Sequence, residues 1–327
     1  MIRTITLNTG FDETVVVSDI DFGGVGALLS RESVPSGKGV NAGRVVRALG
    51  GDVVVYGLVG QADVRQFQAL IAVEGVESRL VAVDASTRRN LTLVSRSSAE
   101  PAAHFRADGF SFTDATPVEQ LIGLLRTDIR VGDIVSLHGS TPDGLDAGTW
   151  TRFAALARRQ GARVVADIYG PALRHLLSSV PVTICKPNEH EIQGLADVGK
   201  EKQRDAVAAA LRLMCSHGVQ MPVVTLGADG LMFAFGDELW QAALTPSAAR
   251  ISVAAGDACA AGMLVALQTG TEPGFEVIRH GIAAAVAHVE ETPLHEFVAR
   301  TNDLLQSVRF GRPEGLLTDA GARSGPG

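Results

Sequence analysis

The chain has 327 residues and a hydrophobic content of 46%, which is enough for one large α/β domain or for two domains with sizeable cores. A formal net charge of −7 argues against nucleic acid or an anionic membrane as the main partner. Three cysteines without metal-ligand spacing, no amino-terminal signal pattern and no membrane-length apolar window predict a cytoplasmic protein.

Short apolar runs that are typical of strands alternate with segments of helical periodicity along most of the chain. Near-continuous apolar strands separated by helices predict a mainly parallel central sheet of an α/β fold, with helices on both faces. Such sheets bind ligands beyond the carboxyl ends of their strands. The expected strands are residues 4–7, 53–59, 134–138, 163–167, 182–185 and 223–226, and the expected helices are residues 41–50, 64–74, 116–127, 148–160 and 203–217.

Two segments, residues 11–36 and 88–112, break this alternation of strands and helices. Polar and apolar residues alternate over residues 90–95, which is the pattern of a strand. Residues 311–327 are rich in Gly, Ala and polar residues and have no helical period, so we expect a disordered tail. Residues 1–310 are expected to form one domain that includes both inserted segments.

A glycine-rich loop at residues 35–41 precedes the first long helical pattern. Gly37 can adopt backbone angles closed to other residues and lets a ligand approach closely. Lys38 offers an ammonium group to an anion, and Asn41 offers a donor and an acceptor to a hydroxyl. The spacing differs from that of a Walker A loop, and an ordinary glycine turn before a helix is the alternative.

A second junction, at residues 252–262, runs from a strand end through small residues into an Ala-rich helical pattern. Small residues at such a junction leave backbone N–H groups open to a phosphate, and the helix dipole favours the anion. Asp257 lies at this junction, where a carboxylate can take a proton from an attacking hydroxyl. The alternative is that Asp257 only caps the first turn of the helix.

The two loops together resemble the signatures of the PfkB, or ribokinase-like, family of carbohydrate kinases, in its 1-phosphofructokinase and tagatose-6-phosphate kinase branch. The resemblance covers about residues 1–310 and implies a ribokinase-like kinase domain. In that family residues corresponding to 11–36 and 88–112 form a small β-sheet lid over the sugar, so the resemblance also implies a homodimer that pairs through this lid. Further segments match in the family's order at residues 6–12, 87–90, 139–144, 186–191 and 225–230.

The resemblance implies transfer of the ATP γ-phosphoryl group to a hydroxyl of a phosphorylated sugar, as in a hexose-phosphate kinase. Asp257 would be the general base, and N–H groups of Ala254, Ala255, Gly256 and Asp257 would hold the transferring phosphoryl group. Asn188 and Glu191 would organise Mg²⁺, partly through water. The implied sugar-phosphate contacts are Asp12, Gly37, Lys38, Asn41, Arg88 and Asn90, with Ser140 and Arg89 as weaker candidates. The implied nucleotide contacts are Lys186, Asn188, Glu191, Thr225, Gly227 and Gly230.

Some ligand-facing residues depart from the family pattern, which suggests an unusual substrate. Ala254 stands where the family has Gly, and Tyr169 stands where it has a small residue. One alternative is a kinase of a neutral sugar, a cyclitol or a nucleoside, and another is a sensor that binds sugar phosphate or nucleotide with little catalysis. The retained Asp257 argues against the sensor. Asn188 could instead begin a helix, with Glu191 as a solvated residue of that helix.

Overall fold

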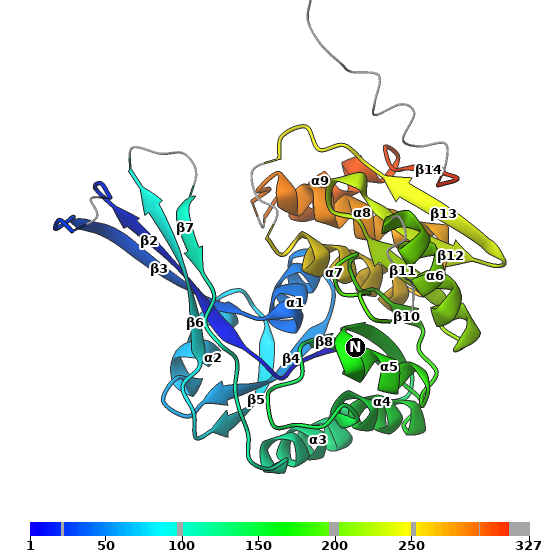
Figure 1. Ribbon diagram of the computed structural model, residues 1–327, viewed down its shortest axis with the longest axis horizontal. Helices are drawn as coiled ribbons and strands as arrows, with labels where there is room; N and C mark the ends of the chain where they lie inside the picture. The colour runs from blue at the N-terminus through cyan, green and yellow to red at the C-terminus, as the bar shows by residue number, and fades with distance from the viewer. Residues whose placement is uncertain (21–22, 97–100, 196–202, 250–252, 294, 314–327) are drawn as a thin grey trace, which may run out of the picture.

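The computed structural model describes residues 1–20, 23–96, 101–195, 203–249, 253–293 and 295–313. Within this part of the chain, ten strands form one large sheet (Figure 1). In sheet order they are β14 (Arg309–Gly311), β13 (Glu238–Ala243), β12 (Leu231–Phe235), β11 (Met221–Thr225), β10 (Ile184–Cys185), β9 (Arg163–Ile168), β8 (Ile134–Gly139), β1 (Ile2–Thr6), β4 (Val53–Gly60) and β5 (Glu77–Val83). The strands from β11 to β5 are parallel, which confirms the expected mainly parallel sheet, and β12 to β14 extend it in antiparallel fashion.

Helices cover both faces of this sheet and enclose two hydrophobic cores (Figure 1). In β4, Val54 and Tyr56 belong to one core while Val53 and Val55 belong to the other, as the alternation of side chains along a strand requires. Strands buried on both faces explain the near-continuous apolar runs of the sequence. One face carries α3 (Thr116–Asp128), α4 (Thr149–Arg159), α5 (Gly170–Leu177) and α6 (Gln203–Ser216), and the other carries α1 (Lys38–Ala48), α2 (Val64–Val73), α7 (Ala255–Gln268), α8 (Phe275–Val289) and α9 (Phe297–Leu305).

A separate four-stranded sheet projects from the body of the molecule (Figure 1). Its order is β3 (Leu28–Ser36), β2 (Gly10–Val17), β6 (Arg88–Ser95) and β7 (Pro101–Phe105). The two central strands, β2 and β6, are parallel and place Asp12 beside Asn90. Apart from Gly10, the strands of this sheet fall within the two segments that interrupt the alternation in the sequence.

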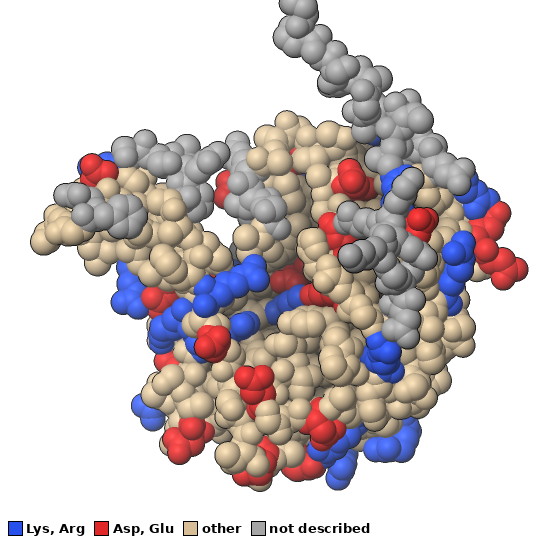
Figure 2. Space-filling model, viewed as in Figure 1, with Lys and Arg blue, Asp and Glu red and all other residues tan. Residues whose placement is uncertain are grey.

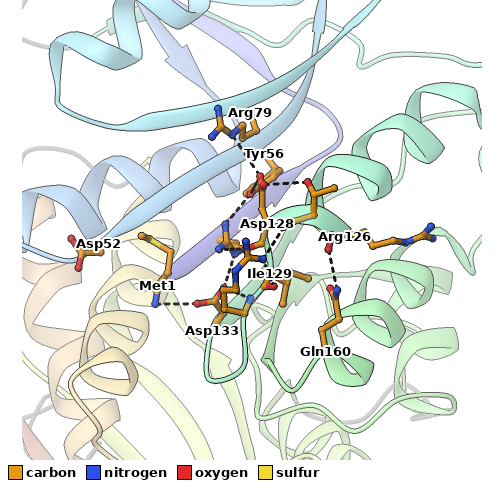
Figure 3. Close-up of polar contacts among 12 residues, drawn as sticks. Met1, Asp52, Tyr56, Arg79, Arg126, Asp128, Ile129, Asp133 and Gln160 are labelled. Carbon is orange, nitrogen blue, oxygen red and sulfur yellow. Dashed lines mark hydrogen bonds and ion pairs between the residues drawn. The ribbon is translucent and has the colours of Figure 1, made fainter.

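A buried polar network ties the sheet together at the amino end of β1, opposite the end where a ligand is expected. The Arg3 guanidinium donates to Asp133 Oδ2 at 2.8 Å and to Tyr56 Oη at 2.9 Å. The Tyr56 hydroxyl in turn donates to Asp128 Oδ2 at 2.7 Å, and Figure 3 shows Tyr56, Asp128 and Asp133 converging there. This network joins β1, β4 and the segment before β8, so we infer that its role is to stabilise the fold.

The bounds of the expected strands and helices lie within three residues of the observed ones, and the differences at β10 and at the tail change the description. Strand β10 has two residues where residues 182–185 are expected, although the Thr183 N–H still donates to Val164 O. The expected tail begins at Gly311, but this residue belongs to β14 and pairs with Gln241 of β13. Residues 314–327 of the expected tail lie outside the described residues. Among the described helices, none has the length and apolar character to span a membrane.

Candidate active site

The polar residues singled out from the sequence gather where the carboxyl ends of β1, β8, β9 and β10 meet the amino ends of α1 and α7. This is the edge at which parallel α/β sheets bind ligands. Figure 2 shows Lys and Arg side chains along the hollow between the small sheet and the body, with acidic side chains beside them. A chain with a net charge of −7 thus concentrates positive charge on the face that the expected anionic ligands would enter.

Asp257 lies in the first turn of α7 and is only 6% exposed. Asn41 Nδ2, from α1, donates to Asp257 Oδ2 at 2.9 Å. Burial raises the pKa of Asp257 to about 7, and the negative charge of Asp167 acts in the same direction. The hydrogen bond from Asn41 and the charges of Lys38 and Lys186 oppose this rise. A carboxyl group with a pKa near neutrality is suited to take up a proton during a reaction at physiological pH.

The backbone before Asp257 forms a strained entry to α7. Ala254 has φ 63° and ψ 7°, the left-handed conformation that Gly adopts freely and that costs other residues about 1–2 kcal/mol. The first N–H groups of a helix generally have no acceptor within it and face any anion placed at its end. Here the Asp257 N–H, one of the four expected donors, instead donates to Ala254 O at 3.0 Å, so the N–H groups before it are the donors that would face an anion. A Cβ atom added to Gly256 would lie 3.6 Å from Lys186 Nζ, so an ammonium group lies beside this helix end. Backbone donors and a lysine therefore converge on one point.

Lys38 and Lys186 share a buried carboxylate that the sequence analysis did not single out. Asp167, at the end of β9, lies 3.0 Å from Lys38 Nζ and 3.1 Å from Lys186 Nζ. Lys38 Nζ also donates to Glu191 Oε1 at 2.5 Å. The two lysines hold the pKa of Asp167 well below its usual range, against the effect of burial. The position of Asp167 as the polar last residue of a predicted apolar strand was the available signal. Lys38, expected to face an anionic substrate, is thus already paired with two carboxylates.

Asn188 and Glu191 cap one another's backbone after β10. Asn188 Oδ1 accepts the Glu191 N–H at 2.8 Å, and Glu191 Oε2 accepts the Asn188 N–H at 3.0 Å. This is the reciprocal arrangement of a capping box, although the segment forms turns and not the helix that the alternative suggested. A parallel bridge to Thr225 places Asn188 beside the end of β11. Asn188, Glu191 and Thr225, which were predicted together, lie together.

Gly227 and Gly230 shape the turn after β11 in different ways. Gly227 has φ 58° and no atom within 4 Å of an added Cβ, so its backbone faces open space. Gly230 has φ 81°, and a Cβ there would lie 2.2 Å from Ala242 O. Packing against β13 therefore explains the glycine at 230, whereas Gly227 is free to approach a ligand.

The predicted sugar contacts lie where the small sheet joins the body. Asp12 accepts hydrogen bonds from Ser36 Oγ and from Asn90 Nδ2, both at 2.7 Å. Gly37 has φ 125°, and an added Cβ would lie 2.9 Å from Thr6 Cγ2, so only glycine fits there without displacement. Ser140 Oγ accepts from Asn8 Nδ2 at 2.7 Å, which holds the loop of residues 139–144 against the segment that follows β1.

Two neighbouring arginines of β6 differ in how far their charge is already neutralised. Arg89 is paired with Glu13 at 2.8 Å and Asp63 at 2.7 Å. Arg88 donates only to the Asn8 carbonyl oxygen, and its buried Nε has no partner among the described residues. Burial lowers the pKa of Arg88, which marks a desolvated cation. Arg88, and not Arg89, is therefore the arginine available to an anionic ligand.

The Tyr169 side chain connects the lysine and arginine sides of the site. Its ring lies 5.4 Å from Lys38 Nζ, and the phenol acts electrostatically on Arg88. It is 37% exposed, which leaves an aromatic surface open at the rim. The aromatic ring that replaces the family's small residue thus lies beside Lys38 and acts electrostatically on Arg88.

Comparisons with known proteins show the family and the fold to which this chain is similar. A family model described as pfkB family carbohydrate kinase matches residues 15–296. The 1-phosphofructokinase of Xanthomonas campestris pv. campestris is 30% identical, over 81% of this chain and 83% of that protein. The 1-phosphofructokinase of Bacillus subtilis is 29% identical, over 95% of this chain and 100% of that protein. The crystal structure of phosphofructokinase-2 from Escherichia coli in complex with fructose-6-phosphate superposes with a TM-score of 0.80 and 25% identity, covering 93% of this chain and 99% of that one.

Proposed function

Because the chain belongs to the pfkB family of carbohydrate kinases, we propose that it transfers the γ-phosphoryl group of ATP to a hydroxyl of a fructose phosphate or a closely related sugar phosphate. The observation that carries this proposal is the placement of Asp257. A buried carboxyl with a pKa of about 7 stands in the first turn of α7, beside backbone donors and Lys186. The attacking hydroxyl and the phosphoryl group would meet at this point.

The chain's own residues supply three elements of the reaction. Asp257 takes the proton of the attacking hydroxyl, and Asn41 keeps its carboxylate oriented. The N–H groups at the start of α7, with Lys186, bind the oxygens of the transferring phosphoryl group. Phosphoryl transfer depends mostly on positioning and electrostatic stabilisation, so this arrangement is sufficient for the chemistry that the protein must provide.

The selectivity for a phosphorylated sugar is assigned to Arg88. Its guanidinium is desolvated and lacks a carboxylate partner among the described residues. A phosphate or another dianion would therefore form charge-assisted hydrogen bonds with it. Asp12, Asn90 and Ser140 would bind the sugar hydroxyls. Lys38 would contribute at the edge of the same site, although its ion pairs with Asp167 and Glu191 already satisfy much of its charge.

Mg²⁺ would be held by Asn188 and Glu191 through water, and it would neutralise the charge of the ATP phosphates. Each carboxylate oxygen of Glu191 accepts one protein hydrogen bond and has a further lone pair for a water ligand. Asn188 Oδ1 already accepts two, from the His190 and Glu191 N–H groups, so Glu191 would be the main acceptor for the water. In the part of the chain that the structure describes, no three His, Cys, Asp or Glu residues are arranged to hold a metal ion directly. That fits Mg²⁺, which keeps several waters and binds chiefly to substrate phosphates.

The assembly proposed is a homodimer in the cytoplasm that forms through the small sheet. The two edge strands of this sheet, β3 and β7, expose large apolar side chains. Leu28 of β3 is 63% exposed and Phe105 of β7 is 58% exposed. A second small sheet that packed on this face would cover them. The size of the particle in solution, measured by light scattering, tests this assembly separately from the activity.

The activity is tested by ADP release with Mg·ATP across sugars, sugar monophosphates, cyclitol phosphates and nucleosides. Turnover with a fructose phosphate and none with the neutral sugars is the expected result. Preference for a neutral sugar would contradict the role of Arg88. Tight binding of ATP or a sugar phosphate without turnover would instead favour a sensor.

A further inference from the structure

The loop that leads into α7 is held at two points by the end of α8. Ser247 donates to Glu290 Oε1 through both its N–H and its hydroxyl, at 2.7 Å each. Nearer the helix, His288 Nε2 lies 2.9 Å from Val253 O. The two contacts flank residues 250–252, which lie outside the described part of the chain. Ser247 and Val253, on either side of these residues, are thus each hydrogen-bonded to the end of α8.

The first attachment is itself rigid, because Arg300 of α9 grips Glu290. Its Nε and Nη2 donate to the two carboxylate oxygens of Glu290 at 2.7 and 3.0 Å. The hydrogen bonds from Arg300, and then those from Ser247, lower the pKa of Glu290 to about 2, although burial opposes them. Glu290 is consequently a fixed anion throughout the physiological pH range.

The second attachment, from His288 to the Val253 carbonyl, determines which ring nitrogen of His288 carries the hydrogen. A carbonyl oxygen can only accept, so Nε2 of His288 carries the hydrogen. Burial lowers the pKa of His288, which keeps the ring neutral and leaves the donor on Nε2. The bond from His288 therefore pulls the Val253 carbonyl towards α8.

This bond determines where the next N–H group points. A trans peptide is planar, and its C=O and N–H groups point in opposite directions. Since the Val253 carbonyl faces His288, the Ala254 N–H of the same peptide faces away from α8. Ala254 also has φ 63°, a conformation that non-glycine residues keep only where their surroundings enforce it. The hydrogen bond from His288 to the Val253 carbonyl is one contact that enforces this conformation, on the amino side of Ala254.

We propose that His288 is a positioning residue that sets the phosphoryl-binding N–H groups at the start of α7, with the Glu290–Arg300 pair anchoring the loop behind it. The inference builds on the proposed function in one respect, namely that the ligand of these N–H groups is the transferring phosphoryl group. His288 does not touch that ligand. It acts through the Val253–Ala254 peptide.

A pair of substitutions separates the hydrogen bond from the bulk of the side chain. His288→Gln places a donor at about the reach of Nε2, whereas His288→Leu fills similar space without one. We expect the Leu variant to lose at least 10-fold in kcat while the KM for the sugar phosphate changes less than 2-fold. The Gln variant should keep kcat within about 3-fold of the parent. A matching loss in both variants, or no loss in the Leu variant, would overturn the proposal.

Hydrogen exchange provides a readout that does not depend on turnover. The amides of Ala254 to Asp257 should exchange faster in His288→Leu than in the parent, while those of β1 and β4 remain unchanged as an internal control for folding. Unchanged exchange at Ala254 to Asp257 would refute the positioning role. A parent protein with no kinase activity, but with faster exchange in the Leu variant, would contradict the proposed function and leave the positioning role supported.

Discussion

Asp257→Asn should stabilise the protein while it removes catalysis, and the stabilisation should depend on pH. Burial and Asp167 raise the pKa of Asp257 from an ordinary 3.8 to about 7. The folded state therefore holds this proton more tightly than the unfolded chain does. The stability that the protonated carboxyl provides is complete below pH 3.8 and is lost as the pH rises through about 7. The amide variant keeps a neutral group at every pH.

The magnitude follows from the distance between the two pKa values. Each pH unit between them corresponds to about 1.4 kcal/mol, so ionising the buried carboxyl costs on the order of 4 kcal/mol by pH 8. Part of that cost is already present at pH 5. The advantage of the variant should thus increase by about 3 kcal/mol between pH 5 and pH 8.

Urea unfolding of the parent and of Asp257→Asn at pH 5, 6, 7 and 8 measures this difference. Stability is a cleaner readout than the pH–rate profile, because a substrate phosphate titrates with a pKa of about 6. The accompanying kcat should fall by roughly 100-fold or more, with the binding of Mg·ATP retained. A difference in unfolding free energy that stays constant with pH would refute the buried-carboxylate reasoning.

Three further substitutions test separate parts of the structure. Ala254→Gly should raise the unfolding free energy by about 0.5–1 kcal/mol, since it relieves a left-handed alanine, and a loss in urea melts would show that the conformation is not strained. Arg88→Ala should raise the KM for the sugar phosphate at least 10-fold and leave that for ATP unchanged, while the matched control Arg89→Ala should change neither KM by more than about 2-fold. Equal effects of the two arginines would contradict this assignment. Asp133→Asn should cost about 3 kcal/mol of stability by breaking the pair with buried Arg3, yet leave kcat/KM intact in the folded enzyme, and a specific loss of kcat would show that the two ends of the sheet are coupled.

Local patterns predicted the mainly parallel sheet and the edge at which it would bind a ligand, whereas most site residues were assigned from the family resemblance. Apolar runs bounded by Gly and polar residues are strong signals, and a residue directly after such a run must lie at the carboxyl edge of a parallel sheet. Asn188, three residues after β10, lies at this edge, where it bridges to Thr225 at the end of β11. The β12–β13 hairpin and helices α5, α8 and α9 were not predicted.

Features that depend on contacts between distant segments could not be predicted from the sequence. The pairing of Lys38 with Asp167 and Glu191 joins α1 to residues more than a hundred positions away, and no local pattern encodes it. The left-handed conformation of Ala254 is likewise imposed by its surroundings, because alanine itself disfavours it. Packing, and not propensity, decides these details of the site.

Transfer of the γ-phosphoryl group from labelled Mg·ATP to fructose 1-phosphate or fructose 6-phosphate tests the central claim most directly. The parent protein should yield a labelled sugar bisphosphate with one of the two, and Asp257→Asn, folded and still able to bind Mg·ATP, should yield at least 100-fold less per unit time. Labelled bisphosphate produced equally fast by both proteins would contradict the role of Asp257 as the base.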